Sequence, residues 1–265
     1  MRTSETAAEL SVLVPVFNEQ DNILPMAREV TAALKAIEIT WELVFIDDAS
    51  TDATWERIAA AGQENPRVRG FRHARNLGQS AAVWTGISNS SGRLLATLDG
   101  DLQNDPAEIP RMLPLLDEVD FVCGDRSAAR RDAWIRRVSS TVARWFRVRA
   151  LGHGFRDTGC ALRVFKREVL TGLFAFNGLH RFLPILVAGG GWKTREVPVN
   201  HRPRVAGRSK YGVWNRLGRG VYDLIGVAWF QQRRLPRAQI STLAMPPARP
   251  SEPPATPNGP DGKPL

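Results

Sequence analysis

The chain has 265 residues, of which 43% are hydrophobic and 24% are charged, and its formal net charge is +9. These values fit an ordinary globular protein with one large domain. Two cysteines exclude a disulfide framework and a four-thiolate zinc site, so a reducing, cytoplasmic compartment is expected.

The positive charge is concentrated in two segments. Residues 126–149 carry +7 and residues 202–237 carry +8, which leaves −6 for the rest of a chain whose total is +9. Two basic segments on an acidic body indicate that this protein meets an anionic partner.

Short apolar segments alternate with segments of helical periodicity through the first half of the chain. The expected strands cover 11–17, 41–47, 68–73, 93–99 and 119–124, and the expected helices cover 22–37, 53–62, 79–90 and 106–116. The last helix should begin at Asp105, an N-cap carboxylate followed by Pro106 at the first helical position. This alternation predicts an α/β fold with a mostly parallel sheet flanked by helices, in which ligands bind beyond the carboxyl ends of the strands.

The remainder of the chain predicts no membrane-spanning helix. The longest apolar candidates, residues 182–192 and 224–230, are shorter than the roughly 20 residues that a span needs. The N-terminus has no signal-peptide pattern, and nine of the last 30 residues are proline, which is typical of a disordered tail. The expected organisation is a flexible N-terminus (1–9), a main domain (10–200), a mobile basic loop (201–211), an amphipathic helix (212–235) and a disordered proline-rich tail (236–265).

Acidic residues gather where the predicted strands end. Glu19 follows the first strand, Asp48 the second, and Asp99, Asp101 and Gln103 the fourth. Carboxylates without a balancing lysine repel one another, and a divalent cation relieves that repulsion. Oxygen donors without histidine or thiolate favour Mg²⁺ or Mn²⁺ over zinc. An isolated Asp-Gly-Asp is more often a plain turn, but acidic residues at three strand ends favour the cation.

Seven motifs follow one another along the chain. They are Val-Pro-Val-Phe-Asn-Glu at 14–19, Val-Phe-Ile-Asp-Asp-Ala-Ser-Thr-Asp at 44–52, Arg-Asn-Leu-Gly-Gln at 75–79, Leu-Asp-Gly-Asp-Leu-Gln-Asn-Asp-Pro at 98–106, Gly-Asp-Arg at 124–126, Phe-Arg-Asp-Thr-Gly at 155–159 and Arg-Val-Ala-Gly-Arg-Ser-Lys-Tyr at 204–211. Together they resemble the family 2 glycosyltransferases of the GT-A fold, in the branch of the polyprenyl-phosphate and dolichol-phosphate sugar synthases. The resemblance implies that residues 10–200 form a GT-A catalytic domain.

The resemblance also implies roles for individual residues on the donor side. The nucleotide-sugar pocket would be lined by Pro15, Phe17, Glu19, Asp48 and Asp99. The metal-binding set would be Asp99, Asp101 and Gln103, with Asp101 and Gln103 as the direct ligands.

On the phosphate side, the resemblance implies that basic and hydroxyl groups hold the acceptor and donor. These groups are Arg126, Arg137, Ser140, Arg204 and Lys210; Arg136 could exchange with Arg137, and Ser139 or Thr141 with Ser140. Asp157 would orient an arginine or the donor. The expected catalytic set is Asp101, Arg126, Asp157, Arg204 and Lys210.

The implied reaction moves a sugar from GDP-mannose or a UDP-sugar to an undecaprenyl-type or dolichyl-type monophosphate, with inversion at the anomeric carbon. A divalent cation would stabilise the departing diphosphate. The acceptor phosphate has a second pKa of about 6 and is largely a dianion at neutral pH, so it needs positioning but no general base. The loop with Arg204 and Lys210 would close over the phosphates as a lid.

Two basic segments carry apolar stripes at helical spacing. The stripes consist of Trp134, Val138, Val142 and Trp145 in the first segment, and of Trp214, Leu217, Val221, Leu224, Ile225 and Ala228 in the second. Basic amphipathic helices with tryptophan commonly lie on anionic membranes, so residues 212–235 would be membrane-proximal. We expect peripheral attachment at the cytoplasmic face, either directly or through an integral membrane partner. The alternative is that both stripes pack on the sheet.

Two other functions are open. A soluble glycosyltransferase acting on a polysaccharide or protein hydroxyl would need a carboxylate base, for which Asp157 is the candidate. A nucleic-acid-binding protein would use the basic segments, but these are amphipathic and match no nucleic-acid module, so no nucleic-acid partner is expected. His180 and Cys160 are interpreted as structural residues. The sequence leaves the identity of the sugar and of the nucleotide open.

Overall fold

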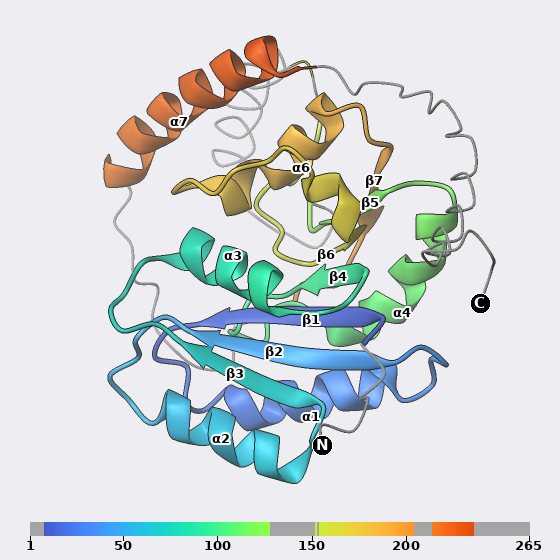
Figure 1. Cartoon of the computed structure of the whole chain (residues 1–265), viewed down its shortest axis with the longest axis vertical. Coiled ribbons are helices and arrows are strands. Elements are labelled where there is room, and N and C mark those ends of the chain that lie inside the picture. The colour runs from blue at the N-terminus through green and yellow to red at the C-terminus, as the bar shows by residue number, and fades with distance from the viewer. Residues whose placement is uncertain (1–7, 128–151, 153, 204–213, 236–265) are drawn as a thin grey trace, which may run out of the picture. The chain divides into compact units, whose positions relative to one another are not determined.

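A computed structural model describes residues 8–127, 152, 154–203 and 214–235 (Figure 1). The strands are β1 (Leu10–Val16), β2 (Trp41–Asp47), β3 (Val68–Arg72), β4 (Leu94–Thr97), β5 (Phe121–Asp125), β6 (Arg163–Lys166) and β7 (Thr194–Pro198). The α-helices are α1 (Ile23–Leu34), α2 (Thr54–Glu64), α3 (Gln79–Asn89), α4 (Ile109–Met112), α6 (Leu179–Gly189) and α7 (Trp214–Arg233).

The strands form one sheet in the order β3-β2-β1-β4-β6-β5-β7. β1 pairs in parallel with β2 and β4, β2 pairs in parallel with β3, and β5 pairs in parallel with β7. β6 runs antiparallel to both of its neighbours, β4 and β5. The predicted mostly parallel sheet is therefore confirmed. β6 and β7, with the sequences Arg-Val-Phe-Lys and Thr-Arg-Glu-Val-Pro, are missing from the prediction.

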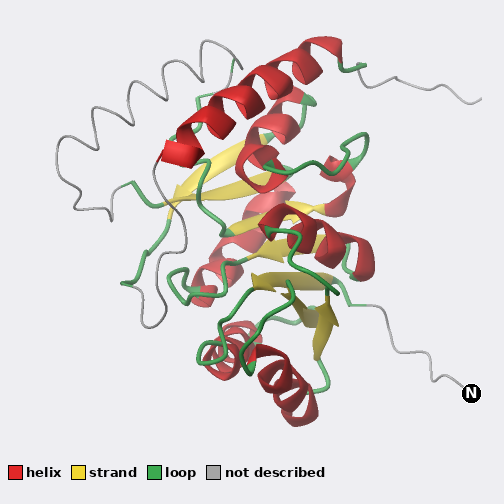
Figure 2. Ribbon diagram, turned by 90° about the vertical axis from the view of Figure 1, so that its left-hand side faces the viewer, coloured by secondary structure: helices red, strands yellow, loops and turns green. Residues whose placement is uncertain are grey.

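The sheet lies between two layers of helices (Figure 2). Successive residues of β1 alternate between the layers: Val12 and Val14 pack with α1, α2 and α4, whereas Leu13 packs with α3 and α6. All seven residues of β2 are buried. Burial on both faces explains why the parallel strands read as nearly continuous apolar runs in the sequence.

The predicted single helix over 106–116 is wrong. The structure has a short 3₁₀ helix at Pro106–Glu108, then α4, then a second 3₁₀ helix at Leu113–Asp117. Pro110 and Pro114 lack the N–H groups that a continuous helix needs, and so they break it. The predicted start is confirmed, because the Asp105 side chain accepts a hydrogen bond from the N–H of Ala107 at 3.0 Å.

Helix α7 packs on α6. Val227 is buried, Gln231 Nε2 donates to the Ile185 carbonyl at 3.0 Å, and Arg234 Nη1 donates to the Leu186 carbonyl at 2.7 Å. Leu224 and Ala228 are partly buried against the core, as in the alternative that the stripe packs on the protein, and the membrane contact of this helix stays a prediction. The side chains of Trp214, Leu217 and Val221, like the whole stripe at 134–145, lie outside the described residues.

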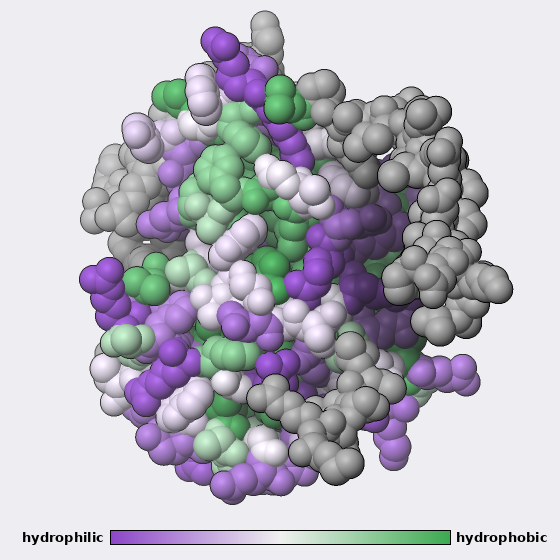
Figure 3. Space-filling model, in the orientation of Figure 1, coloured by the Kyte–Doolittle hydropathy of each residue, from purple (hydrophilic) through white to green (hydrophobic). Residues whose placement is uncertain are grey.

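The outward face of α7 carries an apolar row that shares Ile225 with the predicted stripe. It consists of Tyr222, Ile225 and Trp229, which are 80%, 65% and 63% exposed. Apolar atoms gather over α6 and α7 on the face seen in Figure 3. In the described part of the chain, no helix has the length and apolar character needed to cross a bilayer.

Candidate active site

The loops with the predicted site residues meet at one edge of the sheet. Every strand except β6 ends at this edge, because these strands share one direction, and the antiparallel β6 begins there. Asp157, in the segment before β6, therefore lies at the same edge as the segments that follow β1, β2, β4 and β5. Those four segments carry Glu19, Asp48, Asp101 and Arg126, respectively.

The loop after β4 brings two carboxylates close together. Asp101 is buried and its Oδ1 accepts a hydrogen bond from the N–H of Gln103 at 3.2 Å, while Asp99 Oδ1 accepts one from Gln79 Nε2 at 2.8 Å. Leu102, which follows Asp101, has a left-handed φ of 59°, a strained conformation for a branched residue. Burial, reinforced by the charge of Asp101, raises the pKa of Asp99 from 3.8 to about 6. A cation would relieve the electrostatic repulsion between Asp99 and Asp101.

Asp99, Asp101 and Gln103 fit a hard divalent cation. Mg²⁺ commonly takes one or two protein carboxylates and completes its shell with substrate phosphates and water. Gln103 donates through Nε2 to the Arg202 carbonyl at 3.3 Å, so its amide nitrogen is engaged and its oxygen suits a cation. No group of three or more His, Cys, Asp or Glu side chains in the described ranges could hold a metal. The remaining ligands would thus come from the substrate.

The loops after β1 and β2 are tied to each other by hydrogen bonds. The N–H of Asn18 donates to Ser50 Oγ at 2.8 Å, and the N–H of Glu19 donates to Thr54 Oγ1 at 2.9 Å. Asn18 and Ala49 have left-handed φ values of 53° and 62°. Together with Leu102, these are the positive-φ residues other than glycine in the described chain, and all three lie in loops of this edge. Such strain is characteristic of functional loops.

Asp48 fastens the end of β2 to the start of α3. Its buried carboxylate contacts His73 Nδ1 at 2.7 Å and accepts hydrogen bonds from the N–H groups of Leu77 and Gly78 at 2.8 and 2.7 Å. Gly78 has a φ of +90°, which favours glycine at this turn. The predicted contact of Asp48 with a nucleotide stays a prediction.

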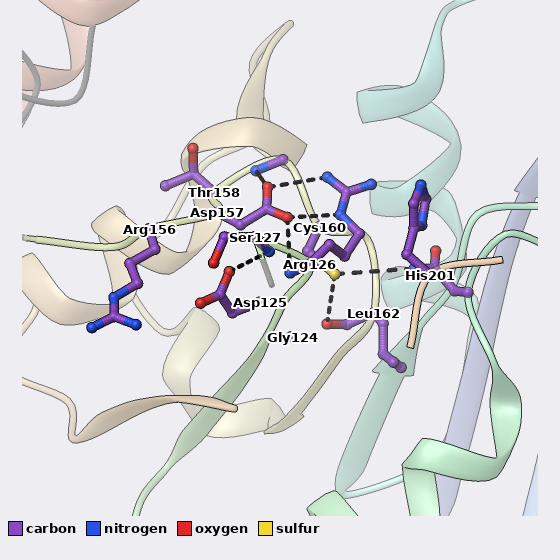
Figure 4. Close-up of polar contacts among 12 residues, drawn as sticks. Gly124, Asp125, Arg126, Ser127, Arg156, Asp157, Thr158, Cys160, Leu162 and His201 are labelled. Carbon is purple, nitrogen blue, oxygen red and sulfur yellow. Dashed lines mark hydrogen bonds and ion pairs between the residues drawn. The ribbon is translucent and has the colours of Figure 1, made fainter. Parts of the chain in front are cut away.

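Arg126 and Asp157 form a buried, two-point ion pair (Figure 4). Arg126 Nε donates to Asp157 Oδ2 at 2.7 Å and Nη2 donates to Oδ1 at 3.0 Å, and each residue is 8% exposed. Glu196 accepts hydrogen bonds from the N–H groups of Arg156 and Asp157 at 2.8 and 3.1 Å, which fixes this loop.

The pair keeps Arg126 charged. Burial lowers the pKa of its guanidinium, but the hydrogen bonds and charge of Asp157 outweigh this effect and the pKa is raised. The charge of Arg126 in turn offsets part of the rise in the pKa of Asp99. The acidic and basic halves of the edge are therefore within electrostatic reach of each other.

A cavity of about 340 Å³ opens beside Asp99, a size that suits a small-molecule ligand. Its walls include Pro15 from β1, Thr97 from β4, Arg163 from β6, and His180 and Arg181 from the start of α6. Pro15 and Asp99 are predicted site residues, and the cavity brings them together.

His180 is a neutral hydrogen-bonding group in this cavity. Its Nδ1 lies 2.6 Å from Ser80 Oγ, which also accepts the N–H of Gly178 at 2.9 Å. Burial and the charges of Arg181 and Arg163 lower the pKa of His180 to about 3. The neutral ring can therefore either accept the Ser80 hydroxyl proton at Nδ1 or donate to the Ser80 oxygen.

Four predicted phosphate-binding residues lie outside the described residues, namely Arg137, Ser140, Arg204 and Lys210. Conversely, the sequence prediction omits Arg163 and treats His180 as structural. Arg163 stands inside the apolar stretch 160–165, and this position was a usable signal that it belongs to a site. Charged residues are rarely buried unless they are paired with another group. Cys160 is buried and the burial raises the pKa of its thiol to about 11, which agrees with its interpretation as a packing residue.

Comparison with known proteins gives consistent matches. The model of the family described as glycosyl transferase family 2 matches residues 11–174. A dodecaprenyl-phosphate galacturonate synthase from Rhizobium johnstonii is 38% identical over 229 residues, which are 84% of this chain and 68% of the relative. An undecaprenyl-phosphate 4-deoxy-4-formamido-L-arabinose transferase from Salmonella gallinarum is 36% identical over 218 residues, 82% of this chain and 66% of the relative. The chain thus spans about two thirds of the length of these relatives.

Solved structures share the fold. Glucosyl-3-phosphoglycerate synthase from Mycobacterium tuberculosis, in complex with Mn²⁺, UDP-glucose and phosphoglyceric acid, superposes with a TM-score of 0.60 at 20% identity, over 84% of this chain and 79% of that one. A mannosyltransferase from Pyrobaculum calidifontis, in complex with GDP-Man and Mn²⁺, gives a TM-score of 0.60 at 20% identity, over 85% and 65% of the two chains. At this level of identity the likeness concerns the fold.

Proposed function

Because the chain belongs to glycosyl transferase family 2, we propose that it transfers a sugar from a nucleotide-sugar to a polyprenyl monophosphate, with inversion at the anomeric carbon. Two relatives at 36–38% identity carry names of polyprenyl-phosphate sugar transferases, which supports this acceptor. Their names differ in the sugar, so the comparison leaves the donor open.

The observation that carries the proposal is the meeting of an acidic set and a buried arginine at one edge of the sheet. Asp99, Asp101 and Gln103 would hold Mg²⁺ or Mn²⁺, which supplies charge neutralisation to the departing diphosphate. The complexes of two structural neighbours with Mn²⁺ support a divalent ion. Arg126, turned by Asp157, then faces the anionic acceptor.

Arg126 has a nitrogen to spare for that acceptor. Its Nε and Nη2 donate to Asp157, so Nη1 is the group that would bind a phosphate oxygen. Both carboxylate oxygens of Asp157 accept hydrogen bonds from Arg126. Asp157 is therefore a positioning residue, and it is poorly suited to accept a proton as a general base. This arrangement favours a phosphate acceptor, which needs no base, over a sugar or protein hydroxyl, which does. Arg137, Ser140, Arg204 and Lys210 would add further phosphate contacts.

We propose that the enzyme works at the cytoplasmic face of a membrane and attaches peripherally through α7. The exposed row of Tyr222, Ile225 and Trp229 combines two amphipathic aromatic rings with a branched apolar side chain, a composition suited to the headgroup layer. Two free, buried cysteines fit a reducing compartment. If α7 does not bind lipid, an integral membrane partner would have to recruit the enzyme.

The decisive experiment incubates the full chain with undecaprenyl phosphate, Mg²⁺ or Mn²⁺, and a panel of UDP- and GDP-sugars. Mass spectrometry of the lipid fraction should show one glycosylated undecaprenyl phosphate. NMR of that product should show that the anomeric configuration is inverted relative to the donor. Chelator should abolish its formation. Transfer to free glycans without any glycolipid would overturn the proposal.

A further inference from the structure

We propose that the sugar transferred by this protein carries a carboxylate, as a hexuronic acid does, and that Arg163 binds this carboxylate in the cavity beside Asp99. The inference rests on the proposed function and narrows its donor. It makes Arg163 the specificity-determining residue for the sugar.

Arg163 is a buried cation without a carboxylate at ion-pair distance among the described residues. Only 4% of the residue is exposed, and the acidic group whose pKa its charge lowers is Asp99, across the same cavity. Its Nη2 donates to the Thr158 carbonyl at 2.9 Å, while Nε is buried without a hydrogen-bond partner. A buried charge is costly unless it is paired, so a protein that keeps one in a cavity is prepared for an anionic ligand.

The position of Arg163 in the sheet explains why none of the described carboxylates forms a close ion pair with it. Arg163 is the first residue of β6 and lies between Thr97 of β4 and Cys123 of β5 in the strand register. Burial raises the pKa of the Cys123 thiol to about 12, so that neighbour is neutral. Asp99 is the acidic wall of the same cavity, but its proposed partner is the cation.

The other groups around the cavity also favour an anion. Arg181, at the first turn of α6, adds a second positive charge at the solvent-exposed side of the wall. His180 stays neutral and adds no negative charge to the cavity wall. A guanidinium and a carboxylate match in planar, two-point geometry, which a neutral hydroxymethyl group cannot provide.

The anion is the sugar's carboxylate rather than the donor's diphosphate. Of the three residues that would hold the cation and with it the diphosphate, only Asp99 lines this cavity, and Asp101 and Gln103 do not. Its size of about 340 Å³ suits one monosaccharide unit as a small-molecule site. The cavity also touches Pro15, a predicted residue of the base and ribose pocket, so it adjoins the place expected for the nucleotide half of the donor.

The test compares donors that differ only at C6, using the full chain. The pairs are UDP-glucuronate with UDP-glucose, UDP-galacturonate with UDP-galactose, and GDP-mannuronate with GDP-mannose. Dissociation constants come from calorimetry with Mg²⁺, and kcat/KM comes from glycolipid formation. In at least one pair the uronate should be favoured roughly tenfold or more, as a buried charge pair predicts.

Three variants identify the residue responsible. Arg163→Gln should remove most of the preference, Arg163→Lys should keep part of it, and Arg181→Gln should reduce it less. Arg93→Gln is the matched control, because Arg93 is exposed and precedes β4 at the opposite edge of the sheet; it should leave the preference unchanged. Arg163→Gln should also leave the midpoint of thermal unfolding the same or higher, since it removes an unpaired buried charge. A merely structural Arg163 would give a lower midpoint.

The outcomes separate the inference from the proposed function. If neutral donors are transferred to lipid as well as or better than every uronate, the inference is wrong and the proposed function stands. A uronate preference that survives both Arg163→Gln and Arg181→Gln also overturns the inference. If no nucleotide-sugar of either kind yields a glycolipid, the proposed function fails and the inference falls with it.

Discussion

Asp157 grips Arg126 with both carboxylate oxygens, at 2.7 Å to Nε and 3.0 Å to Nη2, in a buried setting. Removing one partner of such a pair leaves the other charge buried and alone. We expect Asp157→Ala to lower the free energy of unfolding by about 3–5 kcal/mol, and the double variant Asp157→Ala/Arg126→Met to recover part of this loss. Urea denaturation measures both values.

The exposed pair of Arg195 and Glu118 is the control for that prediction. Their nitrogen and oxygen lie 2.8 Å apart, but the side chains are 42% and 65% exposed. Glu118→Ala should cost less than about 1 kcal/mol, because solvent screens the pair. Equal losses for Asp157→Ala and Glu118→Ala would contradict the special role of the buried pair.

Asp101→Asn should reduce glycolipid formation at least 100-fold, because it removes negative charge from the proposed cation site (about 3 kcal/mol of transition-state stabilisation). Calorimetric titration with Mn²⁺ and UDP should show weaker joint binding. Asp117→Asn is the control, since Asp117 is exposed and far along the chain from the loop. Full activity of Asp101→Asn, or of wild type in chelator, would refute the metal assignment.

Asp99→Asn should stabilise the metal-free fold above pH 6. The pKa of Asp99 is about 6 in the fold against an ordinary 3.8, so the folded state binds more protons between these values. Stability therefore falls as the pH rises through this window, and the penalty is complete above pH 6. The stability difference between Asp99→Asn and wild type, measured in chelator, should grow from pH 4 to pH 6 and then level off.

The exposed Asp21→Asn should show no such pH-dependent difference. Asp99→Asn should nevertheless be inactive in glycolipid formation, so that stability is gained where function is lost. A stability difference that is flat from pH 4 to pH 8 would mean that the pKa of Asp99 is not raised.

Ala49→Gly should raise the free energy of unfolding by up to about 1 kcal/mol, because Ala49 has a φ of 62° that glycine adopts without strain. The same substitution at the exposed Ala59, inside α2, should lower it by about 1 kcal/mol. Thermal unfolding of the two variants side by side checks the signs. A loss of stability in both would argue against strain at position 49.

Trp229→Ser should weaken binding of the full chain to vesicles with anionic lipid, because Trp229 is 63% exposed in the apolar row of α7. Flotation at low salt measures the bound fraction. Gln232→Ser, an exposed polar site on the same helix, is the control and should bind like wild type. If wild type does not float with the vesicles, α7 is not a membrane anchor.

Sequence periodicity sufficed for strands β1 to β5 and for α1, α2 and α3, because buried parallel strands and amphipathic helices leave strong apolar patterns. It failed where prolines break a helical pattern, at Pro110 and Pro114, and it missed β6 and β7. The family resemblance on the seven motifs is confirmed by the family match.

The site was predictable in part for the same reason. Acidic residues at strand ends point to a common edge once the sheet is parallel, and so Asp99 and Asp101 were foreseen. The pairing of Arg126 with Asp157 and the cavity wall at Arg163 depend on the reversed direction of β6. No local pattern encodes that direction, since it follows from how distant segments pair.

The reversal of β6 has one more consequence. β5 and β6 are neighbours, and the chain leaves one and enters the other at the same edge, where Arg126 and Asp157 clasp the two ends together. The entropy of closing such a connection grows only slowly with its length. Exchanging residues 128–151 for longer or shorter segments from other glycosyltransferases should therefore spare the sheet, which makes this connection the natural place to graft new acceptor preferences.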